Sequence, residues 1–322
     1  MPSPNISEII TTTIENRSGV LADNFTTNNA ILMKMKEGDR VKPVNGGYEI
    51  RQELAYAANS TAMRYSGYQT LDISPQDVFT SAAFNIKQYA VAVSISGLEM
   101  LQNTGQEAII DLLESRIENA EGSLMNLIST DMYGDGTAGG GKAIDGLNAL
   151  VSATPTTGTV GGINAATWSF WQNYLYDFSD LSITPSATTI QAAMNAAFLG
   201  TARGRDQVDL IIADNTYYTY YWSSLQGIQR IMDDKKASAG YTTLKFMGAD
   251  VVFDGGVGGG CPANTMFFLN TKYLYFRPHK DRNFVALDPD RFATNQDAMV
   301  KMIAWAGNMT ASNRKLQGRI QN

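Results

Sequence analysis

The chain has very little cysteine or histidine, the residues on which many enzymes and metal sites depend. Each occurs once among the 322 residues, as Cys261 and His279. One cysteine cannot form an intrachain disulfide or a cysteine cluster for a metal ion. A catalytic pair would have to use His279, which follows Pro278 in a basic and aromatic segment. We expect His279 to make a surface or interface contact, and Cys261 to be a plain buried thiol.

Charged residues are also scarce. They make up 17% of the chain, against 44% hydrophobic residues. This composition lets most segments order, and it is low in charge for a soluble monomer, so we expect part of the surface to be covered by other protein. The net charge of -6 provides no cationic field for tight DNA wrapping.

The sequence also lacks long apolar runs. No run is long enough to cross a bilayer, and the first residues, MPSPNISEII, have neither the basic nor the apolar region of a signal peptide. We therefore expect no membrane contact and a cytoplasmic location.

The first hundred residues predict an arm followed by a long hairpin. Residues 1–39 are polar and rich in Asn and Thr, which favours an extended or partly helical arm. One side of a strand at residues 48–56 is formed by Tyr48, Ile50, Leu54 and Tyr56. Residues 57–76 are expected to form the tip, and a strand returns from Phe84 to Ile95 with a bulge near Gln88. We expect the two strands to pair as one long arm.

A helical period follows at Gly105–Tyr133. The predicted buried stripe is Ile109, Leu113, Ile117, Ala120, Leu124 and Leu127. The predicted solvent face carries Glu107, Asp111, Glu114, Glu118 and Glu121. Such a helix would be about 40 Å long. Gly134–Gly141 should end it, because consecutive glycines have the highest backbone entropy cost in a regular element.

The second half of the chain predicts a mixed α+β lobe. Helices are expected at Thr188–Leu199 and at Tyr217–Leu225, the second capped by Asp214. Strands are expected at Val208–Ala213, Met266–Leu269, Tyr273–Phe276 and Ala298–Ala306.

The segment Gly136–Lys142, GTAGGGK, has the glycine and lysine spacing of a phosphate-binding loop. Its context does not fit, because Ala143 stands where Ser or Thr should hold magnesium and a helix precedes the segment instead of a strand. The overlapping GxGxxG pattern has the same fault. We interpret the segment as a loop between lobes.

Two other clusters contain residue types that can bind a metal ion or a nucleobase. Asp131, Asp135 and Asp145 lack the spacing of a calcium loop, and helix-end and turn chemistry explains them. The aromatic cluster is Tyr217, Tyr218, Tyr220, Tyr221 and Trp222. It has no basic neighbours for stacking nucleobases, so packing or subunit contact is favoured. No catalytic, metal-binding or cofactor-binding residue is predicted.

The order of these elements resembles that of the major capsid proteins of tailed phages, which have the Hong Kong 97-type fold. Similar phrases are IDGLNALV at Ile144–Val151, VGGINAATWSFWQN at Val160–Asn173 and WAGNMTASNRKLQGRI at Trp305–Ile320. The resemblance implies an N-arm at 1–45, an E-loop at 46–84, and a peripheral domain at 85–180 and 282–322 with the spine helix at 105–133. It places an axial domain at 181–281.

The resemblance implies a non-enzymatic protein that forms hexamers and pentamers of an icosahedral head shell around double-stranded DNA, without sequence-specific binding. The expected location is the virion, after assembly in the host cytoplasm. Glu49, Arg51, Glu53 and Arg64 are the expected contacts with a neighbouring subunit. No lysine lies between Lys42 and Lys87, so covalent E-loop crosslinks are not expected. Because the chain enters its arm almost immediately, a separate scaffolding protein is expected. A portal protein is expected as a further partner.

Two other functions stay open at the level of sequence. An encapsulin-like nanocompartment shell protein would have a similar fold and would enclose cargo enzymes. A phosphate-binding enzyme built around Lys142 is the alternative of another class.

Overall fold

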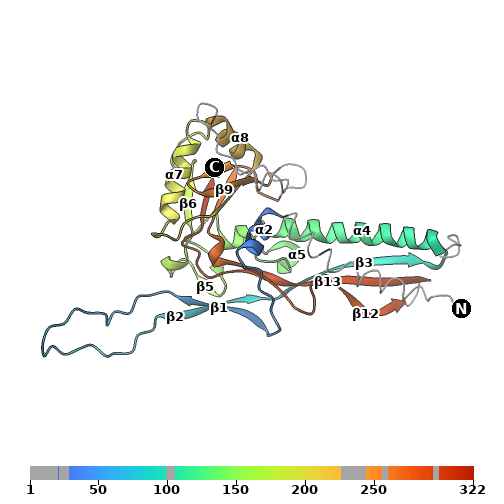
Figure 1. The fold of residues 1–322 in the computed structure, drawn as a ribbon, viewed down its shortest axis with the longest axis horizontal. Coiled ribbons are helices and arrows are strands. Elements are labelled where there is room, and N and C mark those ends of the chain that lie inside the picture. Colours follow the sequence, from blue (N-terminus) through green and yellow to red (C-terminus); the bar gives the residue numbers. More distant parts are fainter. Residues whose placement is uncertain (1–20, 22–28, 99–105, 226–243, 256–259, 293–296) are drawn as a thin grey trace.

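The described chain consists of two lobes and a projecting hairpin. The computed structural model describes residues 21, 29–98, 106–225, 244–255, 260–292 and 297–322. In Figure 1, a long helix lies along an elongated sheet, a second lobe stands beside one end of that helix, and the hairpin points away from both. Helices and sheets occur together in both lobes, so the α+β fold class is confirmed.

The elongated sheet is organised around its longest strand, β13. Its strands are β3 (Lys87–Ser96), β11 (Leu274–Pro278), β12 (Val285–Phe292) and β13 (Ala298–Ala311). β13 pairs antiparallel with each of the other three. It continues past Ala306, where the sequence predicted its end, because its second half pairs with β11 from Gly307 to Ala311.

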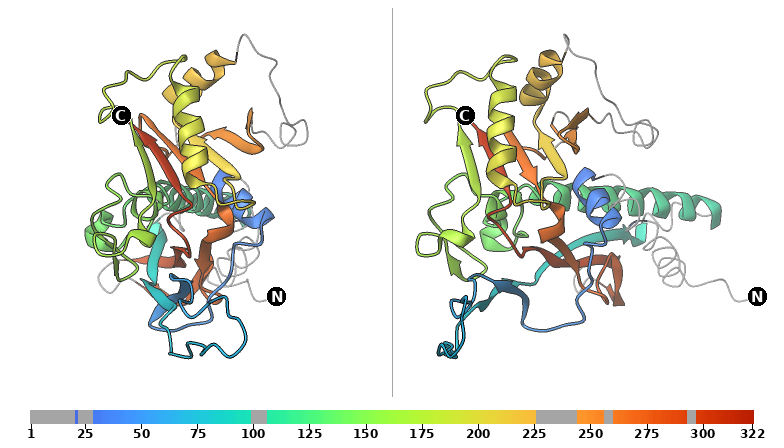
Figure 2. Two further views of the ribbon diagram at one scale, coloured as in Figure 1. Left: turned by 90° about the vertical axis from the view of Figure 1, so that its left-hand side faces the viewer. Right: turned by 60° about the vertical axis from the view of Figure 1, so that its left-hand side comes forward.

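The second lobe contains a mixed sheet with the strand order β6-β14-β10-β7-β9-β8 among the described residues. Its strands are β6 (Tyr174–Asp177), β7 (Leu210–Ala213), β8 (Leu244–Phe246), β9 (Ala249–Phe253), β10 (Thr265–Leu269) and β14 (Gly318–Gln321). Helices α7 (Ile190–Thr201) and α8 (Asn215–Ser224) pack against it (Figure 2). The Asp214 side chain accepts hydrogen bonds from the amides of Thr216 and Tyr217, so the predicted N-cap is confirmed.

Several shorter elements complete the described chain. They are α2 (Ala30–Glu37), α5 (Ala138–Gly141), α6 (Leu147–Leu150), β4 (Thr159–Val160), β5 (Ile163–Asn164), η1 (Ser169–Trp171) and η2 (Thr271–Tyr273). The predicted strand Tyr273–Phe276 therefore begins one residue late, after η2. Most of the predicted arm, residues 1–20 and 22–28, lies outside the described residues.

The projecting hairpin consists of β1 (Glu49–Ala55) and β2 (Phe79–Asn85), which pair antiparallel. The expected hairpin is thus present, but the prediction that one strand runs on to Ile95 is wrong. After Ile86 the chain leaves the hairpin as β3 and pairs with β13 instead. Tyr48 was expected on the buried side, yet it is 92% exposed because β1 begins only at Glu49, after two glycines.

The long helix α4 extends from Gln106 to Asp131, close to its predicted bounds. Ile117, Ala120 and Leu124 are buried as expected. Two positions differ: Leu127 is 50% exposed and Glu121 is buried, because the buried side continues through Ile128. The helical period of 3.6 residues places 121, 124 and 128 on one face, which explains both errors. Ile109 and Leu113 lie outside the residues whose side chains are described.

Two hydrophobic cores hold the lobes. One joins α4, the hairpin strands, β3 and β13, and includes Ile117, Phe84 and Trp305. The other lies between α7, α8 and the mixed sheet, and includes Tyr217 and Tyr221. The prediction that the tyrosine cluster serves packing is confirmed for these two side chains, which are 0% and 2% exposed.

Candidate assembly surface

The tip of the hairpin, residues 57–78, carries large apolar side chains that the chain itself does not cover. Tyr68 is 108% exposed, Ile73 is 92% exposed and Tyr65 is 66% exposed. Met63 and Leu71 are also exposed. Large apolar side chains left exposed on a projecting segment make that segment a candidate site of protein contact.

The four predicted contact residues do not form one cluster. Glu49, Arg51 and Glu53 share the side of β1 opposite Ile50 and Leu54. The Arg51 guanidinium lies 3.9 Å from the Glu49 carboxylate, a partly exposed ion pair. Such a pair contributes little to stability. Arg64 lies apart from them, exposed in the tip.

Glu53 borders a groove rich in cations. Its lining includes Arg40, Arg203 and Lys272, the last two held by Asp206. The Lys272 ammonium lies 2.6 Å and the Arg203 guanidinium 3.0 Å from the Asp206 carboxylate. These hydrogen bonds, with one from the Tyr273 hydroxyl, lower the pKa of Asp206. Positive charge is therefore fixed beside the C-terminal half of β1.

The root of the hairpin, where β2 ends at Asn85, is held in place by the buried side chain of Asn308 in β13. Its Nδ2 donates to the carbonyl oxygen of Asn85, at 2.8 Å, and to Oδ2 of Asp145, at 2.7 Å. Its Oδ1 accepts from the amides of Asp145 and Met309. One side chain thus joins the end of β2, the loop after α4 and the strand β13. Local sequence patterns do not reveal this role of Asn308, because its partners are 163 and 223 residues away in sequence.

Lys87 and Tyr89, both in β3, add further hydrogen bonds near Asn308. Lys87, the first residue of β3, donates from Nζ to the Gly141 carbonyl. The Tyr89 hydroxyl donates to Oδ2 of Asp131 at 2.7 Å and accepts from the Ile144 amide. Burial raises the pKa of Asp145, while the Asn308 hydrogen bond and Lys87 act to lower it.

On the β2 side, the hairpin is also held by a contact with Gly161. The Ala83 amide of β2 donates to the Gly161 carbonyl, in the turn between β4 and β5. Gly161 has φ +58, and a Cβ there would lie 2.8 Å from the Ala82 Cβ and 3.0 Å from the Phe84 ring. Only glycine fits this left-handed position at such close approach.

The acidic and glycine-rich loop does not build a catalytic site. Gly139, Gly140 and Gly141 all have positive φ, and the segment follows α4 and a turn, with no strand before it. A phosphate-binding loop at Lys142 is therefore not formed. Asp135 accepts from the amide and hydroxyl of Thr137, so the predicted turn role is confirmed. Among the described residues, no group of three His, Cys, Asp or Glu side chains could hold a metal ion.

The lone thiol and the lone imidazole lie in different surroundings. Cys261 is half-buried, and burial, with Asp214 and Asp254 nearby, raises the pKa of its thiol, which disfavours the nucleophilic thiolate. His279 is half-exposed at the end of β11, and its Nδ1 accepts from the Asp281 amide. Both side chains fit structural roles.

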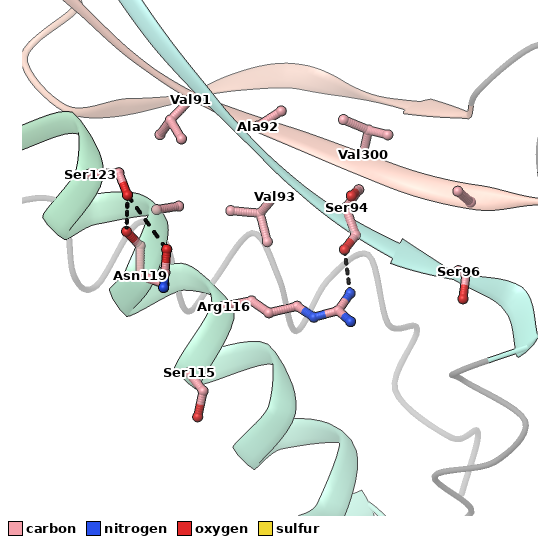
Figure 3. A pocket seen from close by; sticks show the side chains of 12 residues that line it. Val91, Ala92, Val93, Ser94, Ser96, Ser115, Arg116, Asn119, Ser123 and Val300 are labelled. Atoms are coloured by element: carbon pink, nitrogen blue, oxygen red, sulfur yellow. Dashed lines mark hydrogen bonds between the residues drawn. The ribbon is translucent and has the colours of Figure 1, made fainter. Parts of the chain in front are cut away.

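A groove of about 720 Å³ separates α4 from β3 (Figure 3). Arg116 of α4 reaches across it and donates to the Ser94 carbonyl. The other polar lining residues are hydroxyls and an amide, from Ser94, Ser96, Ser115, Asn119 and Ser123. The described lining thus offers no carboxylate or imidazole for general base catalysis.

Among the described residues, no helix is both long and apolar enough to span a membrane.

Comparison with solved structures identifies the arrangement of hairpin, long helix and two lobes. A chain in the capsid asymmetric unit of cyanophage A-1(L) has a similar structure, with a TM-score of 0.62 and 16% sequence identity. The match covers 88% of this chain and 90% of the cyanophage chain. The chain has a phage capsid fold. The capsid of a native GTA particle is similar over 88% of both chains, with a TM-score of 0.55 and 10% identity.

A third capsid-fold structure is the satellite phage P4 procapsid including its size determination protein. The match covers 94% of this chain and 97% of the chain in that structure, with a TM-score of 0.53 and 11% sequence identity. No protein-family profile and no curated protein matches the sequence. The resemblance to tailed-phage capsid proteins is therefore confirmed in three dimensions, at identities too low for sequence matching.

Proposed function

We propose that the chain is a major capsid protein that self-assembles into the icosahedral head shell of a tailed phage. The observation that carries the proposal is the capsid fold together with a hairpin whose apolar tip the chain leaves uncovered. A second subunit that covers this tip removes apolar surface from water, which is the main favourable term in protein association. Many such contacts of modest energy close a shell.

The four predicted contact residues belong to this proposal. Glu49, Arg51 and Glu53 line one side of β1, and Arg64 is exposed in the tip, so all four are available to a neighbour when the hairpin lies across it. Exposed charge pairs add specificity and register more than affinity. With no lysine between Lys42 and Lys87, the contacts are non-covalent.

The proposed domain division is an N-arm at 1–45, an E-loop at 46–84, a peripheral domain at 85–180 and 282–322, and an axial domain at 181–281. The core around α7 and α8 supports the axial domain, although Leu274 and Phe276 of the same range belong to the other core. The core around α7 and α8 draws on residues 178–268, with Ile320 added from the C-terminal strand.

The proposed shell encloses double-stranded DNA without sequence-specific contacts. A net charge of -6 supports this role, because strong phosphate binding by the container would oppose packaging and release. We place the protein in the virion after assembly in the host cytoplasm. Separate scaffolding and portal proteins would supply the shell's size control and its DNA entry point. The role is structural rather than enzymatic.

The alternatives are not favoured. The similar structures reported above are capsids or procapsids, and the loop before Lys142 lacks the strand that a phosphate site requires. An encapsulin-like shell would be small, uniform and filled with protein.

Electron microscopy of the purified protein, with size-exclusion chromatography alongside, tests the proposal. Closed shells, rings of five or six, or curved sheets are the expected result. A protein that stays monomeric even with its scaffolding partner would overturn it. A Lys142→Ala variant should assemble as the unaltered chain does.

A further inference from the structure

An asparagine followed by a glycine, Asn45 and Gly46, lies just before the first strand of the hairpin. No other asparagine in the chain precedes a glycine. Both residues are exposed, and residues 45–47 belong to no helix or strand. Among the described residues, neither the Asn45 side chain nor the Gly46 amide has a hydrogen-bond partner. The two groups are therefore free to approach each other.

Glycine at position 46 favours a reaction within the chain. Its amide nitrogen directly follows Asn45, so attack on the Asn45 Cγ closes a small succinimide ring with both reactants already held close together. A side chain at position 46 would shield this nitrogen. Gly46 has none, and its φ of +134 is a conformation that other residues rarely adopt. A Cβ built at this position would meet nothing within 4 Å, so no neighbouring group crowds the ring.

Cations lie next to this pair. The backbone just before it runs beside the end of β11, where the Lys280 amide donates to the Val44 carbonyl at 3.0 Å. Lys42 precedes Val44 on the same segment, and Arg282 follows in the turn after β11. In the described chain, none of these three cations has a carboxylate within 4 Å. Asp281 is the only acidic residue in the turn 279–282, so the local charge is positive.

We propose that Asn45 is a site of spontaneous deamidation. The Gly46 amide gives its proton to solvent and its nitrogen bonds to the Asn45 Cγ. The bond from Cγ to Nδ2 then breaks, and ammonia leaves with a proton from water. A second water opens the succinimide at either carbonyl and leaves aspartate or isoaspartate. Negative charge develops during ring closure, and the neighbouring cations stabilise it. The inference goes beyond the proposed function and does not depend on it.

The reaction changes both the charge and the backbone at this position. Each converted chain gains one carboxylate, which lies among Lys42, Lys280 and Arg282 and offsets their positive charge. Isoaspartate also lengthens the main chain by one bond, between the segment paired with β11 and the start of β1. The modification therefore accumulates with age at the point where the chain enters the hairpin.

Peptide mapping by mass spectrometry tests the site. The folded chain and a synthetic peptide of residues 41–48 are kept at physiological temperature and neutral pH, and samples are digested over several weeks. Conversion appears as the small mass increase that accompanies replacement of an amide by an acid, and electron-transfer fragmentation distinguishes isoaspartate from aspartate. Asn59 is the internal control. It is also exposed, but Ser60 follows it and its Oδ1 accepts from the Thr61 amide.

We expect Asn45 to convert in the folded chain at least as fast as in the peptide, while Asn59 stays largely intact. A folded chain that converts much more slowly than the peptide, or that converts Asn59 as fast as Asn45, would overturn this inference and leave the shell function standing. An Asn45→Gln variant should give no product at this position, because its longer side chain closes a ring less readily.

A charge variant tests the role of the cations. Lys280→Gln should slow the conversion of Asn45 about twofold, the size of effect expected for an exposed charge. Lys142→Gln is the matched control, since Lys142 is also exposed but lies in the loop after α4, and it should leave the rate unchanged. Circular dichroism and melting establish that each variant is folded. Equal rates in the two variants would contradict the proposed stabilisation by neighbouring cations.

Discussion

The root and the tip of the hairpin differ in what holds them. At the root, Asn308 is 0% exposed and makes hydrogen bonds to two distant segments of the chain, at Asn85 and Asp145. At the tip, Tyr68 and Ile73 are almost fully exposed, and residues 57–78 contain no regular strand. The same two-stranded element therefore serves the fold at one end and presents an uncovered surface at the other. The root fixes the direction in which the tip projects. The apolar surface of the tip can be removed from water only by a neighbouring subunit.

The largest expected effect comes from removing the tip. Replacing residues 60–74 with a short Gly-Ser turn should abolish assembly, seen by electron microscopy, and leave the melting temperature within about 2 °C, because those residues bury little in the monomer. As the control, the double change Thr61→Ser and Thr70→Ser should assemble normally. A tip deletion that unfolds the protein would show that the tip also belongs to the fold.

The next largest effect is expected at the root. Asn308→Ala leaves the Asn85 carbonyl and the Asp145 carboxylate without their donor, and should lower the free energy of unfolding by about 3 kcal/mol. Urea denaturation measures this. Asn126→Ala, on the exposed side of α4, should change it by about 0.5 kcal/mol or less. Equal losses for the two variants would refute the fastening role of Asn308.

A smaller effect isolates the close approach at Gly161. Gly161→Ala adds a Cβ at positive φ and in contact with Ala82, with an expected loss of about 2 kcal/mol. Gly162→Ala has the same backbone cost, at φ +76, but its Cβ would meet nothing within 4 Å. It should lose about 1 kcal/mol. The difference in free energy of unfolding between the two variants measures the contact with β2. Equal losses would mean that the turn between β4 and β5 does not hold the hairpin in place.

The smallest effect is a change in pH dependence. Burial raises the pKa of Asp145 in the folded chain above its value of about 3.9 in the unfolded chain. The folded state then binds the proton more tightly, so this group costs stability as the pH rises through its folded pKa, and the cost is absent below about pH 3.9. Asp145→Asn should therefore flatten the fall in melting temperature above that pH. A steeper fall would contradict the sign.

Local patterns in the sequence predict the regular elements well. The helical period locates α4, alternation locates β1, and a cap residue locates α8, because each depends on residues within a few positions of one another. The pattern did not reveal that the strand after Ile86 leaves the hairpin. That change depends on β13, whose partner residues lie more than two hundred positions away.

The candidate site divides in the same way. The expected contacts on β1 and in the tip could be named from charge and alternation, but the aromatic groove lined by Tyr56, Phe79, Trp168 and Phe170 could not. Its wall joins Tyr56 to Trp168 and Phe170, which are brought together only when β2 packs on the β4 and β5 turn. Asn308 is likewise an ordinary polar residue in sequence, and only its burial shows its role.

Hydrogen exchange measured on the free chain and on assembled particles tests the central claim most directly. We predict that amides of residues 57–78 exchange rapidly in the free chain and become protected in particles. Amides around Asn308 should be protected in both states. A tip that exchanges equally fast in free and assembled protein would contradict the claim that its uncovered surface is buried by a neighbouring subunit.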